Sequence, residues 1–199
     1  AIQRGEVAHV ERLQGPKESR NTTHVCVVDG AGNAVSMTHS LGMPSGIITD
    51  GMGFMYNGCM GVFDPRPGRA GSLAPGKGRF SSLCPTIVLR DGEPTLVIGA
   101  PGGTQIAMGV LQGILNVLDF DMSPLEAVSA PRFSATSDPI DVSNRIPRTV
   151  TDQLAERGYQ IVRNAHSYPF ASVHAIRIDD GQWRGGADPN RDGMALLVP

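Results

Sequence analysis

Residues 22–40 read TTHVCVVDGAGNAVSMTHS. On each side of a central turn, Gly30-Ala31-Gly32-Asn33, the side chains alternate between apolar and polar with a period of two. That alternation is typical of a strand with one buried face, and glycine and asparagine tolerate the backbone angles of tight hairpin turns. The stretch therefore predicts a β-hairpin whose first residue is Thr22.

The residues before this hairpin divide into two parts. Between Ala1 and Leu13 apolar residues recur three apart, which predicts a helix. Glycine, proline and a polar run up to Asn21 then end it and indicate an exposed linker. Ala1 is not an initiator methionine, and no signal-peptide pattern opens the chain. We therefore expect a piece of a longer protein, and the sequence does not indicate its cellular compartment.

The residues after the hairpin predict more strands and several helices. A strand near residues 53–57 is followed by the proline- and glycine-rich stretch FDPRPGRAGSLAPGKGRF, where we expect a long loop. PTIVLR and PTLVIGA predict a second hairpin with both faces buried. Helical spacing and caps predict three helices: over residues 107–118, from Pro124 with Ser123 as its N-cap, and over residues 149–157. The closing strands are predicted from YQIVRN, SVHAIRIDD and MALLV. This order indicates an α+β layered fold.

Composition narrows the possible functions. A chain of 199 residues, 40% of them apolar, can bury the core of one domain. With 17 basic and 19 acidic residues and no run of lysine or arginine, we expect no nucleic-acid partner. The longest apolar stretch, near residues 106–118, falls short of the roughly 20 residues that cross a bilayer, so we expect no membrane segment.

The cysteines and histidines predict neither a disulfide framework nor a metal site. Three cysteines cannot all pair with one another, and Cys26 lies between valines in a predicted strand, where a thiol is inert core. The five histidines show no metal-ligand spacing. We therefore expect no metal and no cofactor.

Thr22 is the candidate nucleophile. A threonine hydroxyl needs a base to take its proton, and a chain-terminal threonine carries one in its own α-amine, whose pKa lies near neutrality. Cleavage between Asn21 and Thr22 would place such an amine at a strand end. The alternative is that Thr22 and Thr23 stand here only because threonine favours strands.

Two further elements could serve amide chemistry. Gly102 and Gly103 follow a predicted strand and precede a helix, so their backbone N–H groups could hold an oxyanion; the alternative is a plain tight turn. The hydroxyls of Ser81 and Ser82 could bind a carboxylate, or they are ordinary loop serines.

Taken together, these segments resemble the small catalytic subunit of the γ-glutamyltranspeptidases, which are N-terminal-nucleophile hydrolases. The likeness implies a four-layer αββα sandwich completed by a large subunit cut from the same precursor, with which this part would form a heterodimer. Residues 1–21 would then end the large subunit, and residues 22–199 would be the catalytic small subunit. The matching segments are TTHVCVVDGAGNAVSMTHSLG, GFMYNG, FDPRPG, LAPGKGRFSSLCPTIV, IGAPGGTQI, LEAVSAPRF and GADPN.

The resemblance also implies roles for single residues. Thr22 would be the nucleophile, freed by self-cleavage after Asn21, and Ser40 would be the second hydroxyl that supports its amine. The oxyanion glycines would be Gly102 and Gly103. The α-carboxylate of a γ-glutamyl group would be held by Ser81 and Ser82, with an arginine from the large subunit.

The sequence departs from the family where the α-amine of the γ-glutamyl group is bound. Typical members use Asn, Gln and Asp side chains; here Gly42, Cys59 and Val62 stand at the matching positions. The default function is γ-glutamyl transfer or hydrolysis on donors such as glutathione. One alternative is a glutaryl or cephalosporin acylase with an altered acyl pocket. Another, of a different class, is an unprocessed inactive homologue.

Overall fold

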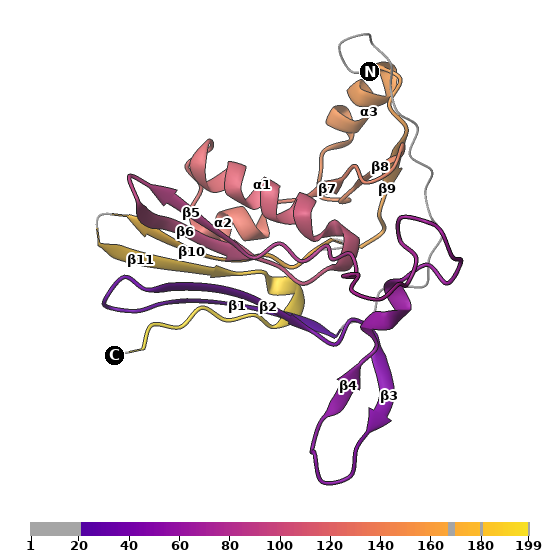
Figure 1. The fold of residues 1–199 in the computed structure, drawn as a ribbon. Coiled ribbons are helices and arrows are strands. Elements are labelled where there is room, and N and C mark those ends of the chain that lie inside the picture. Colours follow the sequence, from indigo (N-terminus) through magenta and orange to yellow (C-terminus); the bar gives the residue numbers. More distant parts are fainter. Residues whose placement is uncertain (1–20, 167–169, 180, 199) are drawn as a thin grey trace.

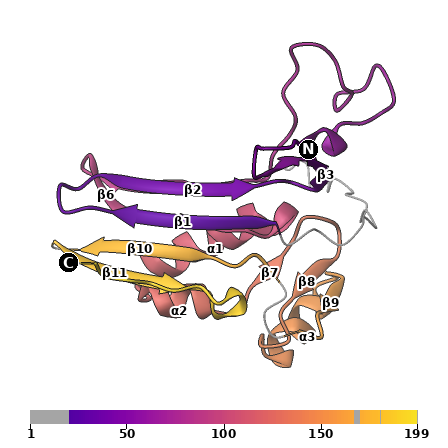
Figure 2. The ribbon, with the colours of Figure 1, turned by 90° about the horizontal axis from the view of Figure 1, so that it is seen from below.

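A computed structural model describes residues 21–166, 170–179 and 181–198. At its centre is an antiparallel sheet in the order β11-β10-β6-β5. Two helices cover one face of this sheet, and the hairpin β1-β2 covers the other (Figures 1 and 2). The elements of these layers are β1 Thr22–Val28, β2 Ala34–Ser40, β5 Thr86–Arg90, β6 Glu93–Gly99, α1 Ile106–Leu118, α2 Pro124–Ser129, β10 His174–Asp179 and β11 Gln182–Ala187.

The main core lies between α1 and the central sheet. Its apolar side chains come from one face of α1 and from β6, the most buried strand. Gly109 and Gly113 let α1 approach the sheet closely, because a Cβ at Gly113 would stand 2.8 Å from Ile98 Cδ1 and one at Gly109 would stand 3.0 Å from Ala171 Cβ. The glycines that interrupt this apolar run therefore bring the helix against the sheet.

Polar side chains join the hairpin to the central sheet. Ser36 Oγ on β2 donates to the carbonyl of Ile98 at 2.9 Å and accepts the N–H of Thr86 at 3.1 Å. The ring of His24 on β1 occupies the place where a Cβ on Gly99 would stand. These contacts fix β1, the first described strand, against the central sheet.

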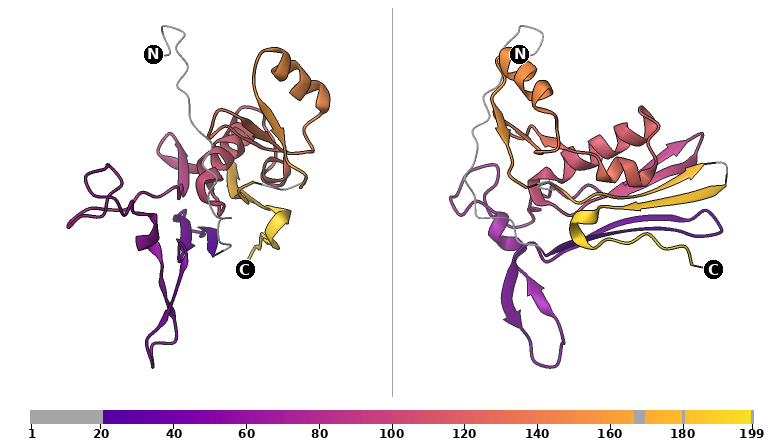
Figure 3. Two further views of the ribbon diagram at one scale, coloured as in Figure 1. Left: turned by 90° about the vertical axis from the view of Figure 1, so that its right-hand side faces the viewer. Right: turned by 180° about the vertical axis from the view of Figure 1, so that it is seen from behind.

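Two smaller units extend from these layers (Figure 3). An arm of β3 Pro44–Ile48 and β4 Met55–Asn57 projects from the end of the hairpin, and the short 3₁₀ helix η2 Cys59–Val62 follows it. On the other side, β7 Phe133–Ser134, β8 Ile140–Val142 and β9 Ile161–Arg163 form a small sheet carrying α3 Arg148–Glu156. Two further 3₁₀ turns are η3 Gly103–Gln105, before α1, and η4 Pro189–Arg191, near the C-terminus.

The structure confirms most of the predicted elements. Both hairpins, the strand near residue 55, the three helices and the strands near residues 162 and 176 are present, and the fold is α+β. Ser123 caps α2 in a capping box with Glu126. The helix predicted within residues 1–13 lies outside the described residues.

Two predictions are wrong. The segment MALLV forms no strand: it runs beside β11, with Ala195 over Gly185, and its large side chains are mostly exposed. The strand β5 is not buried on both faces, because Ile87 and Leu89 on one face are 39% and 58% exposed. Among the described residues, no helix is long and apolar enough to span a bilayer.

Candidate active site

The hydroxyl of Thr22 lies at the first position of β1 and meets a second hydroxyl from β2. Thr22 and Ser40 are partners in the antiparallel register, and their Oγ1 and Oγ atoms are 2.8 Å apart. Ser40 Oγ also accepts the backbone N–H of Gly42 at 2.9 Å. The hairpin register therefore brings together the two hydroxyls that the sequence singled out.

The carbonyl of Thr22 and the side chain of Asn21 also lie against the fold. Arg191 donates from Nη1 to the carbonyl oxygen of Thr22 at 3.2 Å. Asn21 precedes the bond expected to be cut, and its Nδ2 is buried with no hydrogen-bond partner among the described residues. Sequence reasoning missed Arg191, because only the fold brings it next to a residue 169 positions away.

The glycine turn between β6 and α1 has the backbone expected of a place where N–H groups are exposed. Gly102 has a φ of 145° and Gly103 a φ of 58°, both in the region that favours glycine. Neither backbone N–H has an acceptor among the described residues. A hydrogen bond from the segment before β10 holds the turn, because the N–H of Ser172 donates to the carbonyl of Pro101 at 2.9 Å. Two unpaired donors in a fixed turn suit a developing oxyanion.

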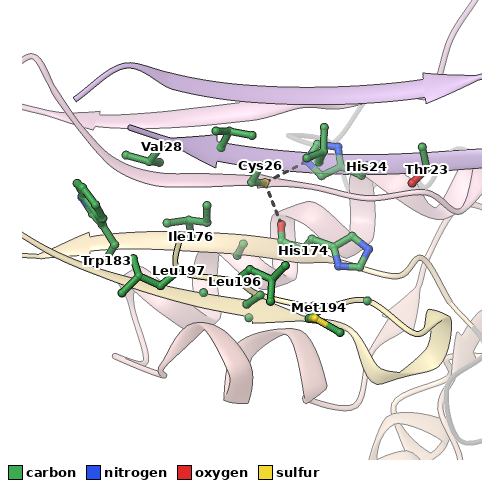
Figure 4. Close-up of a pocket in the computed structure, with 18 of the residues that line it drawn as sticks. Thr23, His24, Cys26, Val28, His174, Ile176, Trp183, Met194, Leu196 and Leu197 are labelled. Carbon is green, nitrogen blue, oxygen red and sulfur yellow. Dashed lines mark hydrogen bonds between the residues drawn. The ribbon is translucent and has the colours of Figure 1, made fainter. Parts of the chain in front are cut away.

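A cavity of about 1240 Å³ runs along β1 and contains Thr22 and Pro101 in its wall. Figure 4 shows the side chains between β1, β10 and the C-terminal segment, with His24 and His174 near one end and Trp183 at the other. Thr22 and Pro101, the residue before the glycine turn, thus border one space.

Burial suppresses charge on the groups beside the nucleophile. Burial lowers the pKa of His24 to about 4, with a further effect from His174, and its Nδ1 is 2.8 Å from Thr38 Oγ1. Burial also raises the pKa of Cys26 to about 12. Near neutral pH, the uncharged imidazole of His24 does not act as an acid, and the protonated thiol of Cys26 does not act as a nucleophile. This supports the interpretation of Cys26 as inert.

The remaining predicted site residues fall into two groups. Gly42 lies against Cys59, since a Cβ on Gly42 would be 3.0 Å from Cys59 Sγ, and Val62 ends the same short helix that Cys59 begins. Ser81 is exposed and Ser82 half-buried in the irregular stretch before β5. No hydrogen bond joins either serine to Thr22 among the described residues.

The first carboxylate after the short helix that contains Cys59 and Val62 is already paired with an arginine. Asp64, two residues after Val62, pairs with Arg66 at 2.8 Å, and its hydrogen bonds with Arg66 hold the pKa of Asp64 below its usual value. Cys59 Sγ donates to the carbonyl of Leu41 at 3.6 Å. Within the described residues, no cluster of three or more metal-binding side chains occurs.

Comparison with known proteins places this geometry in a family. The family profile described as gamma-glutamyltranspeptidase matches residues 2–198. The Acylase ACY 1 proenzyme of Pseudomonas sp. strain V22 is 37% identical over 91% of this chain, and the glutathione hydrolase proenzyme of Pseudomonas aeruginosa is 32% identical over 96% of it. The chain spans 33% and 37% of their respective lengths, about a third of each.

A solved structure agrees with the sequence comparisons. A chain of the Helicobacter pylori gamma-glutamyltranspeptidase T380A mutant superposes with a TM-score of 0.76 and 37% identity. The match covers 84% of this chain and 98% of that one. The α+β fold that the resemblance implied is therefore confirmed, and this chain belongs to the gamma-glutamyltranspeptidase family.

Proposed function

We propose that this chain is the nucleophile-bearing part of an enzyme that cleaves amides through an acyl-threonine intermediate on γ-glutamyl compounds such as glutathione. The observation that carries the proposal is the 2.8 Å contact between the Thr22 and Ser40 hydroxyls at the first paired position of β1. It holds the oxygen of Thr22 at the strand end where self-cleavage after Asn21 would create an α-amine.

The reaction would run in two halves. The α-amine of Thr22 takes the hydroxyl proton while Oγ1 attacks the donor carbonyl carbon, and the N–H groups of Gly102 and Gly103 hold the oxyanion. The carbon–nitrogen bond then breaks and the ammonium returns its proton to the leaving amine, leaving an ester on Thr22. Water or an acceptor amine attacks this ester, which gives hydrolysis or transfer and frees Thr22.

Residues outside this chain would complete the enzyme. We propose that residues 1–21 end a large subunit and residues 22–199 form the catalytic small subunit, the two remaining together as a heterodimer after cleavage. The relatives are described as proenzymes, and this chain spans about a third of their length. A donor carboxylate would be held by Ser81 and Ser82 with an arginine from the large subunit.

The test of the nucleophile is Thr22→Ala in the full precursor. Self-cleavage and turnover should both be lost, because the same hydroxyl attacks in each, while Thr22→Ser should keep part of both. Intact mass follows cleavage, and release of a chromogenic anilide follows turnover. A precursor that is folded but never breaks after Asn21 would support the inactive homologue instead.

The acyl group has a second candidate, because the positions that match the family's amine-binding residues carry no acidic or amide side chain here. The positions of Gly42, Cys59 and Val62 offer an ammonium ion no carboxylate, and Asp64 nearby is already paired with Arg66. Similarity to an acylase proenzyme adds to this observation. A glutaryl chain, which has the carboxylate but no amine, would bury only methylenes there.

Competing donors decide between the two acyl groups. If the acceptors are lost, the parent should prefer glutaryl over γ-glutamyl anilide, and Val62→Asp should shift the ratio of kcat/KM toward γ-glutamyl. Met60→Asp is the control, because it adds the same charge to the same short helix at an exposed position. A parental preference for γ-glutamyl of tenfold or more, about 1.4 kcal/mol, would exclude the altered pocket.

A further inference from the structure

A short turn near the C-terminus touches both halves of the candidate active site. Asp188 is the N-cap of η4, and its Oδ1 accepts the backbone N–H of Asn190 at 2.8 Å. In Figure 1 this turn is the yellow coil beside the hairpin, at the end where β1 begins. It follows β11 directly, so it is attached to the central sheet.

The first contact of the turn is with the nucleophile. Arg191 is half-buried, and its Nη1 donates to the carbonyl of Thr22 at 3.2 Å. This carbonyl belongs to the peptide that joins Thr22 to Thr23. Holding that peptide plane restricts rotation of the Thr22 backbone, and with it the directions of the hydroxyl and of the α-amine that cleavage would free.

The second contact is with the oxyanion turn. Asn190 donates from Nδ2 to Ser172 Oγ at 3.4 Å, and the Ser172 N–H in turn donates to the carbonyl of Pro101. The neighbouring Ala171 lies against Gly102, where an added Cβ would stand 2.5 Å from Ala171 Cα. Movement of η4 would therefore reach both the nucleophile and the oxyanion donors.

The turn is anchored by a buried ion pair. Asp188 is 0% exposed and Arg132 is 4% exposed, and Arg132 Nη2 donates to Asp188 Oδ2. The same carboxylate accepts the N–H of Val173 at 3.4 Å, and Arg132 Nη1 donates to the carbonyl of Val128 at 2.6 Å. Removing one member would leave a buried charge unpaired, so the pair fixes the position of the turn strongly.

We propose that Arg191 is a positioning residue for Thr22, and that the Asp188–Arg191 turn sets the nucleophile at its working distance from the Gly102–Gly103 turn. This inference rests on the proposed amidase function. Arg191 acts through the backbone of Thr22 and needs no contact with substrate. Its loss should therefore slow the attack by Thr22 without weakening donor binding.

The experiment compares Arg191→Met, Arg191→Lys and Arg191→Gln in the full precursor. For Arg191→Met we expect self-cleavage and kcat to fall about tenfold to a hundredfold, the scale of a small misplacement of a reacting group, with KM within about twofold of parental. Lysine keeps a charged donor and glutamine a neutral one, so both should recover part of kcat. Arg145→Met is the matched control, because Arg145 also donates from Nη1 to a backbone carbonyl, that of Ser129 rather than that of Thr22.

The outcomes separate the two proposals. Parental kcat in Arg191→Met, or a change in KM alone, overturns the positioning role and leaves the amidase proposal standing. If Arg191→Met does not fold, the folded variants Arg191→Gln and Arg191→Lys decide instead. A kcat equal to that of the parent in both overturns the positioning role. A graded loss of kcat with unchanged KM supports it. A parent that neither cleaves itself nor turns over any donor overturns both.

Discussion

At the scale of single residues, position 102 requires glycine for two separate reasons. Its φ of 145° is rarely adopted by other residues, and a Cβ there would meet Ala171. We expect Gly102→Ala to lower kcat about a hundredfold, because the backbone shift that the Cβ forces would move one oxyanion donor out of position. Gly30→Ala is the control, since Gly30 has no atoms within 4 Å of an added Cβ and no positive φ. Equal rates for the two variants would show that residue 102 only makes a turn.

Cys26 makes a second residue-scale prediction, about reactivity. Its pKa of about 12 leaves roughly one thiol in ten thousand ionised at pH 8, and the thiolate is the reactive form. Iodoacetamide should therefore leave Cys26 unmodified in the folded protein and modify it after denaturation, as read by peptide mass. Cys26→Ser should keep turnover near the parental rate. Rapid alkylation of the folded protein would contradict the inert assignment.

His24 makes stability depend on pH. Its pKa is lowered to about 4 by burial and by His174, whereas an exposed histidine in the unfolded chain titrates near 6.5. As pH falls from 6.5 to 4, the unfolded state binds the proton first, so His24 lowers stability progressively across that window. Thermal unfolding of the precursor should show a falling Tm, and His24→Gln should flatten the slope. An equal slope in the variant would assign the effect to other groups.

At the scale of elements, the capping box of α2 marks the start of that helix in the sequence and stabilises its first turn. Ser123 Oγ accepts the N–H of Glu126 at 3.3 Å, and the Glu126 carboxylate accepts the N–H of Ser123 at 2.8 Å. Ser123→Ala should cost about 1 kcal/mol of local stability and speed amide exchange in residues 124–129 about fivefold, as measured by mass spectrometry. Ser123→Asp should stay near the parental rate, because aspartate also caps.

The elements also show what a sequence can reveal. The hairpin β1-β2 and the helices α1 and α2 were predictable because alternation, helical spacing and a cap are local patterns. The strand β11 was missed because QWRGGA carries two glycines and little alternation, yet it pairs with β10 over six residues. MALLV has the composition of a strand but no strand partner among the described residues, and propensity alone does not make a strand.

Some residues of the candidate site were likewise predictable from the sequence, and others were not. The family resemblance identified Ser40 as the second hydroxyl, and the register of the hairpin pairs it with Thr22. The glycine turn was visible as a break between a strand and a helix. Arg191, Asp188 and Arg132 were not predictable as a connected group, because their contacts join residues 56 and 169 positions apart.

At the scale of the whole molecule, the outer face of the hairpin predicts a partner. Val25, Val27, Val35 and Met37 are between 40% and 50% exposed and alternate with the side chains that face the central sheet. No helix covers this face within the described residues, as Figure 2 shows. We expect the proposed large subunit to bury it.

The test is to place a charge on that face in the full precursor. Val27→Lys with Met37→Lys should reduce the amount of large subunit that copurifies with the small one, because a charge buried without a partner is costly. The control is Val150→Lys on α3, which is similarly exposed and lies on the small separate sheet. Undiminished copurification with the double variant would place the contact elsewhere.

The pairing of Thr22 with Ser40 also determines how the protein would mature over time. The bond between Asn21 and Thr22 lies just outside the first pair of the hairpin, so breaking it removes no pair between β1 and β2. All the groups that break this bond would belong to the same molecule. Maturation should therefore be first order, with a half-life that does not change when the precursor is diluted a hundredfold. Each molecule would become active independently of the others and would need no processing protease.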